Sequence, residues 1–268
     1  MLLTILTSVA AFVLANFLAR FFAKTDLSER GIYAYSFMFS NMGYLGDPVT
    51  LALFGETGFT YYKIFTLPLS ILVFTWGISV LIPSTAPEST DTNKAARIMS
   101  GLKKALNPPT IAMLLGMLVG VTDTVGYIPG FVTNALDTLK VCMGPSAMLA
   151  AGFTIAAYGI KDMMSQKKVY IATGLRLVII PAIIIPLLYV LKLGVGALLG
   201  VTLNNNILFY AIFAFAGPLG LNTVVFPKAY GGDARTGAAM TLVSHTLCMI
   251  TIPLVYTLIE LIFGGYVF

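Results

Sequence analysis

An apolar segment near the start of the chain is interrupted by Ser40-Asn41-Met42-Gly43-Tyr44-Leu45-Gly46-Asp47-Pro48. A later apolar segment is interrupted in the same way by Ala216-Gly217-Pro218-Leu219-Gly220-Leu221-Asn222-Thr223, and then by Pro227. Proline removes a backbone donor and clashes with the preceding helical turn, and glycine leaves helical geometry easily. Each run therefore predicts a helix that breaks near its middle.

The chain around these two runs has the composition of a membrane protein. Of its 268 residues, 58% are hydrophobic and only 10% are charged, whereas about 25% are charged in an average soluble domain. Such a chain lacks the polar residues that a water-exposed surface needs, and a lipid environment removes that need. We therefore expect an all-α integral membrane protein that binds the lipid bilayer and no nucleic acid.

Eight apolar segments approach the roughly 20 residues that a helix needs to cross a bilayer. A polar interval at 84–107 separates three of them from the other five, which predicts a cytoplasmic loop between an N-terminal part (1–83) and a C-terminal part (108–268). The eight segments are about 2–22, 29–54, 62–83, 108–122, 130–159, 168–191, 206–228 and 236–264.

The basic residues indicate how these segments are oriented. Thirteen of the 16 lysine and arginine residues lie in or beside alternate connections between the segments. Because cytoplasmic loops are enriched in such residues, the alternation supports eight spans with both termini outside the cell membrane. No basic residue precedes the apolar residues 2–19, so a spanning helix is expected there rather than a cleaved signal peptide.

The positions of the two broken segments suggest an internal repeat. The first is the second of three segments before the loop, and the second is the fourth of five after it. Two further helices at the start would give two five-helix halves, and an odd number of helices inverts the second half. The expected fold is an inverted-repeat (5+5 type) carrier with two broken crossover helices and an incomplete first repeat, either natively short or truncated.

Paired broken segments predict a transport site. Half-helices present N-termini with partial positive charge and free N–H groups, which suit an anion. Asn41 and Asn222 add an amide to each break, and Gly43 and Gly220 lie beside them. We therefore expect a small organic anion to bind where the two breaks meet.

Two ionisable residues are candidates for coupling transport to an ion. Asp47 lies within an apolar segment, where a charge is costly and often functional. His245 can exchange a proton near neutral pH. Coupling to a proton or to sodium is left open. Arg176 is expected to extend to the cytoplasmic membrane surface.

The residues do not indicate a metal site, an intramembrane protease or a nucleotide-binding site. Cys142 and Cys248 are far apart, the chain has one histidine, and no metal-binding spacing occurs, so neither a metal nor a cofactor is expected. An intramembrane aspartyl protease needs a glycine where this chain has Tyr44, and a second aspartate motif that is absent. No nucleotide-binding loop occurs either. We therefore expect a protein that is not an enzyme.

The order of several motifs resembles that of the auxin efflux carrier family, in the bile acid:sodium symporter-like superfamily. The resemblance runs from the third to the tenth helix of that family. Its motifs are Phe39 to Pro48 followed by Leu53-Phe54-Gly55-Glu56-Thr57-Gly58; Asn107-Pro108-Pro109 with Gly116; Asn222 with Tyr230-Gly231-Gly232-Asp233; and Ser244-His245 with Pro253.

The resemblance implies a secondary carrier of carboxylates such as malonate, malate or auxin-like acids, working by elevator-like alternating access. It implies that Asn41, Gly46, Pro48, Pro218 and Asn222 line the crossover. It also suggests a homodimer. The chain departs from the family at Asp47, where an apolar residue is more usual, and in lacking the first two helices. A truncated, non-transporting membrane protein or assembly partner is therefore the alternative.

Overall fold

A computed structural model of the chain describes residues 1–81, 108–229 and 232–267. The elements of this part are all helical, with one isolated β-bridge, so the prediction of an all-α integral membrane fold is confirmed. By length and composition, five helical stretches in the described part can cross a membrane. They are Leu2–Phe22, Met42–Leu81, Gly130–Tyr158, Lys167–Leu199 and Arg235–Phe263.

Helix α1 (Leu2–Phe22) has a small-residue face and a bulky face. Ala11, Ala15 and Ala19 are buried at four-residue spacing, which lets a neighbouring helix approach closely. Its main neighbour is α2 (Leu27–Met38). Large apolar side chains at the same spacing on the other face remain exposed, as in a lipid-facing helix: Val9, Val13, Phe17 and Phe21.

Helix α2 is the central helix of the N-terminal part. The Asp26 side chain caps it by accepting hydrogen bonds from the backbone N–H groups of Ser28 (2.9 Å) and Glu29 (3.1 Å). Every residue from 31 to 40 is buried. The helix ends at Met38, and a π-helical turn, η1 (Met42–Gly46), begins after Asn41. The chain thus leaves helical geometry within the first predicted break.

Helix α3 (Asp47–Leu72) is folded back at Gly55, whose φ of 66° and ψ of −175° are not helical. Lys63 Nζ lies 2.8 Å from Asp47 Oδ2 although 16 residues separate them, and 16 residues of straight helix would rise about 24 Å. The part before Gly55 therefore completes the second predicted span. The part after it begins the third, which continues through η2 (Val73–Gly77) and α4 (Ile78–Leu81).

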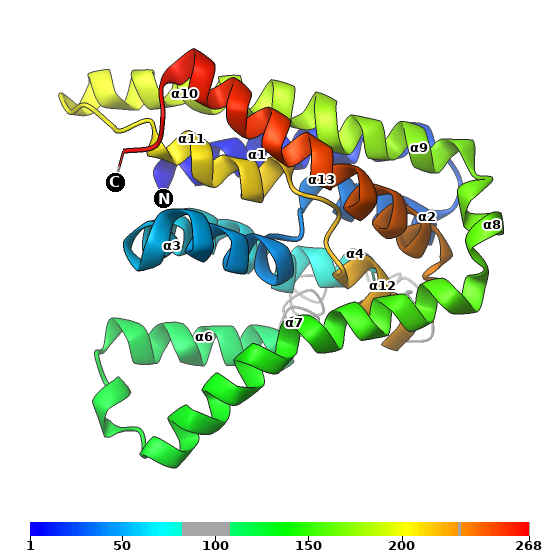
Figure 1. Cartoon of the computed structure of the whole chain (residues 1–268), viewed down its shortest axis with the longest axis horizontal. Coiled ribbons are helices and arrows are strands. Elements are labelled where there is room, and N and C mark those ends of the chain that lie inside the picture. The colour runs from blue at the N-terminus through cyan, green and yellow to red at the C-terminus, as the bar shows by residue number, and fades with distance from the viewer. Residues whose placement is uncertain (82–107, 230–231, 268) are drawn as a thin grey trace, which may run out of the picture.

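The second half of the chain begins with a helical hairpin. Helix α6 (Pro108–Val121) and α7 (Gly130–Tyr158) are joined through the short turn η3 (Val125–Tyr127), and they match the fourth and fifth predicted segments. Figure 1 shows α6 and the start of α7 along one edge of the molecule, apart from α1 and α10. Helix α8 (Ile160–Met164) then leads to α9.

The sixth segment is longer than the sequence suggested. Helix α9 (Lys167–Gly174), η4 (Leu175–Ile179) and α10 (Ile180–Leu199) run on past residue 191, where the predicted span ended one residue before a lysine. That lysine, Lys192, is 7% exposed, and its ammonium group donates a hydrogen bond to Asn205 Oδ1. Because the charge has a partner inside the protein, the helix continues beyond it.

The last two segments complete the fold. Helix α11 (Asn206–Ala211) and η5 (Ile212–Ala216) lead into the second break, after which α12 (Asn222–Ala229) resumes. Helix α13 (Arg235–Phe263) follows and packs on α7, α9 and α12. The predicted loop at 84–107 lies outside the described residues, and the division into inverted repeats stays a prediction.

Candidate functional site

The two broken segments cross each other at their breaks. Ser40 and Leu219 form an antiparallel β-bridge, the one isolated bridge of the described part. The Asn41 N–H donates to the Pro218 carbonyl at 2.8 Å. Residues about 180 positions apart thus share backbone hydrogen bonds in the middle of two apolar segments.

Side-chain hydroxyl groups form hydrogen bonds with backbone groups at or near the two breaks. Ser40 Oγ donates to the carbonyls of Phe213 (2.5 Å) and Ala214 (2.9 Å) in η5. Ser244 Oγ of α13 accepts from the Leu219 N–H at 3.2 Å. Tyr62 Oη donates to the Met42 carbonyl at 2.9 Å. Unpaired backbone groups are costly inside a membrane, so these bonds stabilise the open chain.

The side chain of Asn41 is held by His245. Asn41 Nδ2 lies 2.9 Å from His245 Nε2, and His245 Nδ1 lies 2.9 Å from the Thr241 carbonyl. Because a carbonyl can only accept, Nδ1 carries the ring hydrogen, and Nε2 of the neutral ring accepts from the amide. His245 therefore fixes the direction of the Asn41 side chain.

The side chain of Asn222 has a matching partner on the first segment. Its Nδ2 donates to Tyr35 Oη at 2.9 Å, and Tyr35 is 1% exposed. The hydroxyl of a buried tyrosine needs a partner, so this bond fixes both side chains. Each of the two asparagines is thus oriented by an aromatic residue from the other half of the chain: Asn41 by His245 of α13, and Asn222 by Tyr35 of α2.

A cavity of about 540 Å³ opens beside the crossing. It is walled by both breaks, by α3 and by parts of α6 and α7. Apolar residues such as Met42, Val73, Phe74 and Phe226 form much of its wall. Five of the residues predicted for substrate binding or ion coupling line it: Asn41, Gly43, Asp47, Gly220 and Asn222.

The other predicted residues lie next to this cavity without lining it. A Cβ on Gly46 would come within 2.5 Å of Tyr62 Oη, so this glycine allows close packing behind the wall. Pro48 starts α3, and Pro218 accepts the hydrogen bond from Asn41. His245 acts on the cavity through Asn41.

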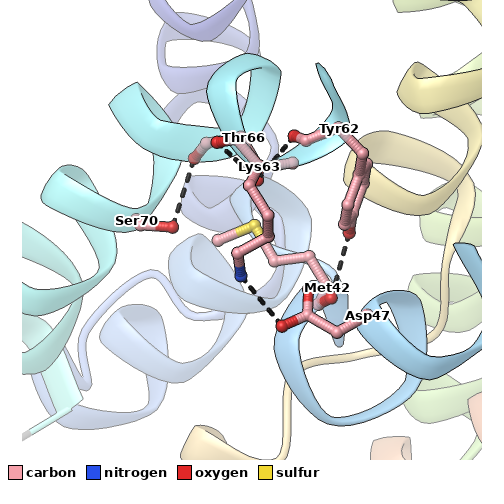
Figure 2. A network of polar contacts seen from close by, with 6 residues as sticks. All are labelled: Met42, Asp47, Tyr62, Lys63, Thr66 and Ser70. Atoms are coloured by element: carbon pink, nitrogen blue, oxygen red, sulfur yellow. Dashed lines mark hydrogen bonds and ion pairs between the residues drawn. The ribbon is translucent and has the colours of Figure 1, made fainter. Parts of the chain in front are cut away.

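One stripe of α3 contributes residues that the sequence analysis missed. Lys63, Thr66 and Ser70 line the cavity at helical spacing, and Figure 2 shows them on one face of the helix. Thr66 and Ser70 donate to the carbonyls one turn earlier, whereas Lys63 pairs with Asp47 at 2.8 Å. The three- and four-residue spacing of these polar residues in an apolar segment was the signal that could have found them.

Arg176 is placed differently from the prediction. It is fully buried in η4 and does not extend to the membrane surface. Its Nη1 donates to the Phe215 carbonyl at 2.8 Å, just before the second break. The arginine therefore packs behind the crossing, held by a backbone group that the π-helical turn η5 leaves available.

Two helix starts face the cavity. The π-helical turn η1 begins at Met42 and α12 begins at Asn222, and the residues at both starts line the wall. The start of a helix carries partial positive charge, and in α12 the N–H groups of Thr223, Val224 and Val225 already donate to the carbonyls of Gly220 and Leu221. Two broken helices that meet at a cavity inside a membrane protein are typical of membrane transporters.

The sequence profile of a family described as membrane transport protein matches residues 1–256. The chain therefore belongs to this family, which contains the auxin efflux carriers, as the motifs predicted. Neither a search of curated proteins nor a search of solved structures found a match. Members of the family are transporters and not enzymes, so the protease alternative is excluded.

Proposed function

We propose that the chain is a secondary carrier of small organic anions, in particular carboxylates, which it binds where the broken segments cross. The observation that supports this most is the cavity itself. Two helix starts and the amides of Asn41 and Asn222 face one space.

The two amides can bind a carboxylate directly. Each Nδ2 carries two hydrogens, and the described hydrogen bonds use one of them. The second hydrogen of each amide can donate to a substrate oxygen. The helix starts add positive potential at the same cavity.

The position of the proposed site, between two crossing segments, is compatible with alternating access to the two sides of the membrane. A substrate held between two crossing segments reaches one side of the membrane or the other when the crossing moves as a unit against the remaining helices. We expect this elevator-like movement in the cell membrane, with both termini outside and with transport driven by a proton or a sodium ion.

The first prediction concerns the two asparagines. Asn41→Ala and Asn222→Ala should each lower the apparent affinity for a transported carboxylate by roughly tenfold or more, since a hydrogen bond to a charged group contributes about 1.5–3 kcal/mol. The measurement is uptake of labelled mono- and dicarboxylates into proteoliposomes over a range of concentrations. Asn134→Ala in the exposed first half of α7 is the matched control and should behave as wild type.

Two outcomes would contradict the proposal. Unchanged uptake in both variants would remove the asparagines from the site. A folded wild-type protein that moves no carboxylate under any proton or sodium gradient would favour the alternative of a non-transporting membrane protein.

A further inference from the structure

The two charged side chains in the cavity wall are paired with each other. Lys63 Nζ and Asp47 Oδ2 are 2.8 Å apart, across the fold-back at Gly55. The Lys63 side chain is 47% exposed and the Asp47 side chain 23% exposed. The pair is therefore accessible from the cavity, and partly exposed ion pairs are weak.

A second lysine lies within electrostatic range of the same carboxylate. Lys140 of α7 interacts with the charge of Asp47, and Met143, three residues later, lines the cavity. The structure gives Lys140 no hydrogen bond or ion pair within the described residues. Lys140 does not itself line the cavity, so its positive charge acts on the Asp47 carboxylate from outside the cavity wall.

We infer that Asp47 is a built-in counter-ion of Lys63 that a substrate carboxylate displaces, and that it restricts the cavity to anions with a single negative charge. The inference rests on the proposed function and names the residue that sets the charge of the substrate. The carboxylate of the substrate and the carboxylate of Asp47 compete for the same ammonium group.

The charge limit follows from the repulsion between carboxylates. A monocarboxylate that binds Lys63 adds one negative charge to the cavity, and the positive charge of Lys140 partly offsets that of the displaced Asp47 carboxylate. A dicarboxylate brings a second negative charge close to Asp47, in a cavity whose remaining wall is largely apolar and screens charges poorly. A dianion should therefore bind less tightly than a monoanion with the same carbon skeleton.

The test compares butyrate with succinate, which have the same number of carbon atoms. Binding of each acid to the purified full chain is measured by calorimetry, at a pH where both are fully ionised. Wild type should bind butyrate more tightly. Asp47→Asn should improve succinate binding by about tenfold or more, and butyrate binding by less, because the repulsion is gone.

Further variants keep the test decisive. Lys63→Gln should weaken the binding of both acids, and Glu56→Gln, an exposed carboxyl on α3, should leave both unchanged. If Asp47→Asn is not monodisperse on size exclusion, Asp47→Ser provides the same comparison, because it also removes the negative charge and keeps a small polar side chain.

The outcomes separate the two proposals. Wild-type binding of butyrate with an equal effect of Asp47→Asn on both acids, or with no effect of Lys63→Gln, would overturn the counter-ion role and leave the proposed function standing. Wild-type protein that binds neither acid and takes up no other carboxylate would overturn both.

Discussion

At the scale of single residues, the proposed site depends on how the side-chain amides of Asn41 and Asn222 are oriented. Asn41 is held by His245, and Asn222 by Tyr35, through hydrogen bonds of 2.9 Å. Tyr35 lines the cavity and His245 does not, and both side chains are neutral in this arrangement. A residue that orients another contributes to affinity because it removes alternative rotamers before the substrate arrives.

The second prediction tests this role for His245. His245→Ala should lower the apparent affinity for substrate by about three- to tenfold, since one neutral hydrogen bond contributes about 0.5–1.5 kcal/mol. The maximal uptake rate should change little. The measurement is the concentration dependence of uptake in proteoliposomes, with Thr246→Ala on the exposed face of the same helix as the control.

A loss of maximal rate without any change in affinity would argue against orientation. It would instead indicate that His245 takes part in the movement or in ion coupling. Restored affinity in His245→Gln would support the orienting role, because a glutamine amide can still accept from Asn41.

At the scale of elements, the N-terminal part depends on the fold-back inside α3. Gly55 has φ of 66° and ψ of −175°, a region that is open almost only to glycine. This one residue lets the chain reverse between the second and third spans. The reversal brings Lys63 to Asp47, and Tyr62 to the Met42 carbonyl (Figure 2).

The third prediction concerns this glycine. Gly55→Ala should destabilise the protein by about 1–3 kcal/mol, because alanine is strained in this backbone conformation although no atom would clash with its Cβ. The expected result is a lower midpoint in a thermal aggregation assay in detergent. Gly116→Ala in α6 is the control, since its backbone is helical and its Cβ would meet open space.

An unchanged midpoint in Gly55→Ala would mean that the reversal does not need a positive φ. A second measurement addresses the same point. If the fold-back places Lys63 beside Asp47, then Gly55→Ala should also weaken substrate binding, whereas Gly116→Ala should not.

At the scale of the whole molecule, the apolar surface and the position of the two termini are both as expected for a membrane protein. Large apolar side chains are exposed along α1, α6, α7, α10 and α13, where lipid would cover them. Figure 1 shows the N- and C-termini at the same end of the molecule. Termini on the same side agree with an even number of crossings.

The fourth prediction places that side outside the cell. Short epitope tags at either terminus should bind antibody on intact cells, because the basic residues mark the opposite side as cytoplasmic. A tag inserted in the 84–107 interval should bind only after the membrane is permeabilised. The reverse pattern would invert the proposed orientation.

Much of the fold was predictable because it depends on local properties of the chain. Apolar length gave the helical segments, and Pro, Gly and Asn gave the two breaks. The asparagines of the proposed site were predicted for the same reason, since they lie in the breaks themselves. The end of α10 was predicted too early. The sequence does not show that the charge of Lys192 is paired with Asn205 inside the protein.

The part of the site that could not be predicted depends on distant contacts. In the sequence, Lys63 is one of the three basic residues outside the alternate, basic connections, and Arg176 was expected to reach the membrane surface. Only packing shows that Lys63 pairs with Asp47 across a reversal and that Arg176 is buried behind η5. Neither position is encoded by the neighbours of these residues in the sequence.

The sequence alone determined that this protein is a helical membrane transporter with two interrupted segments, because hydrophobic length and helix breakers act within a few residues. The tertiary structure decided that the interruptions cross, which side chains aim the two asparagines, and that a lysine and an aspartate share one cavity wall. Those features arise from contacts between residues 16 to 204 positions apart, and no local pattern fixes which distant groups will meet.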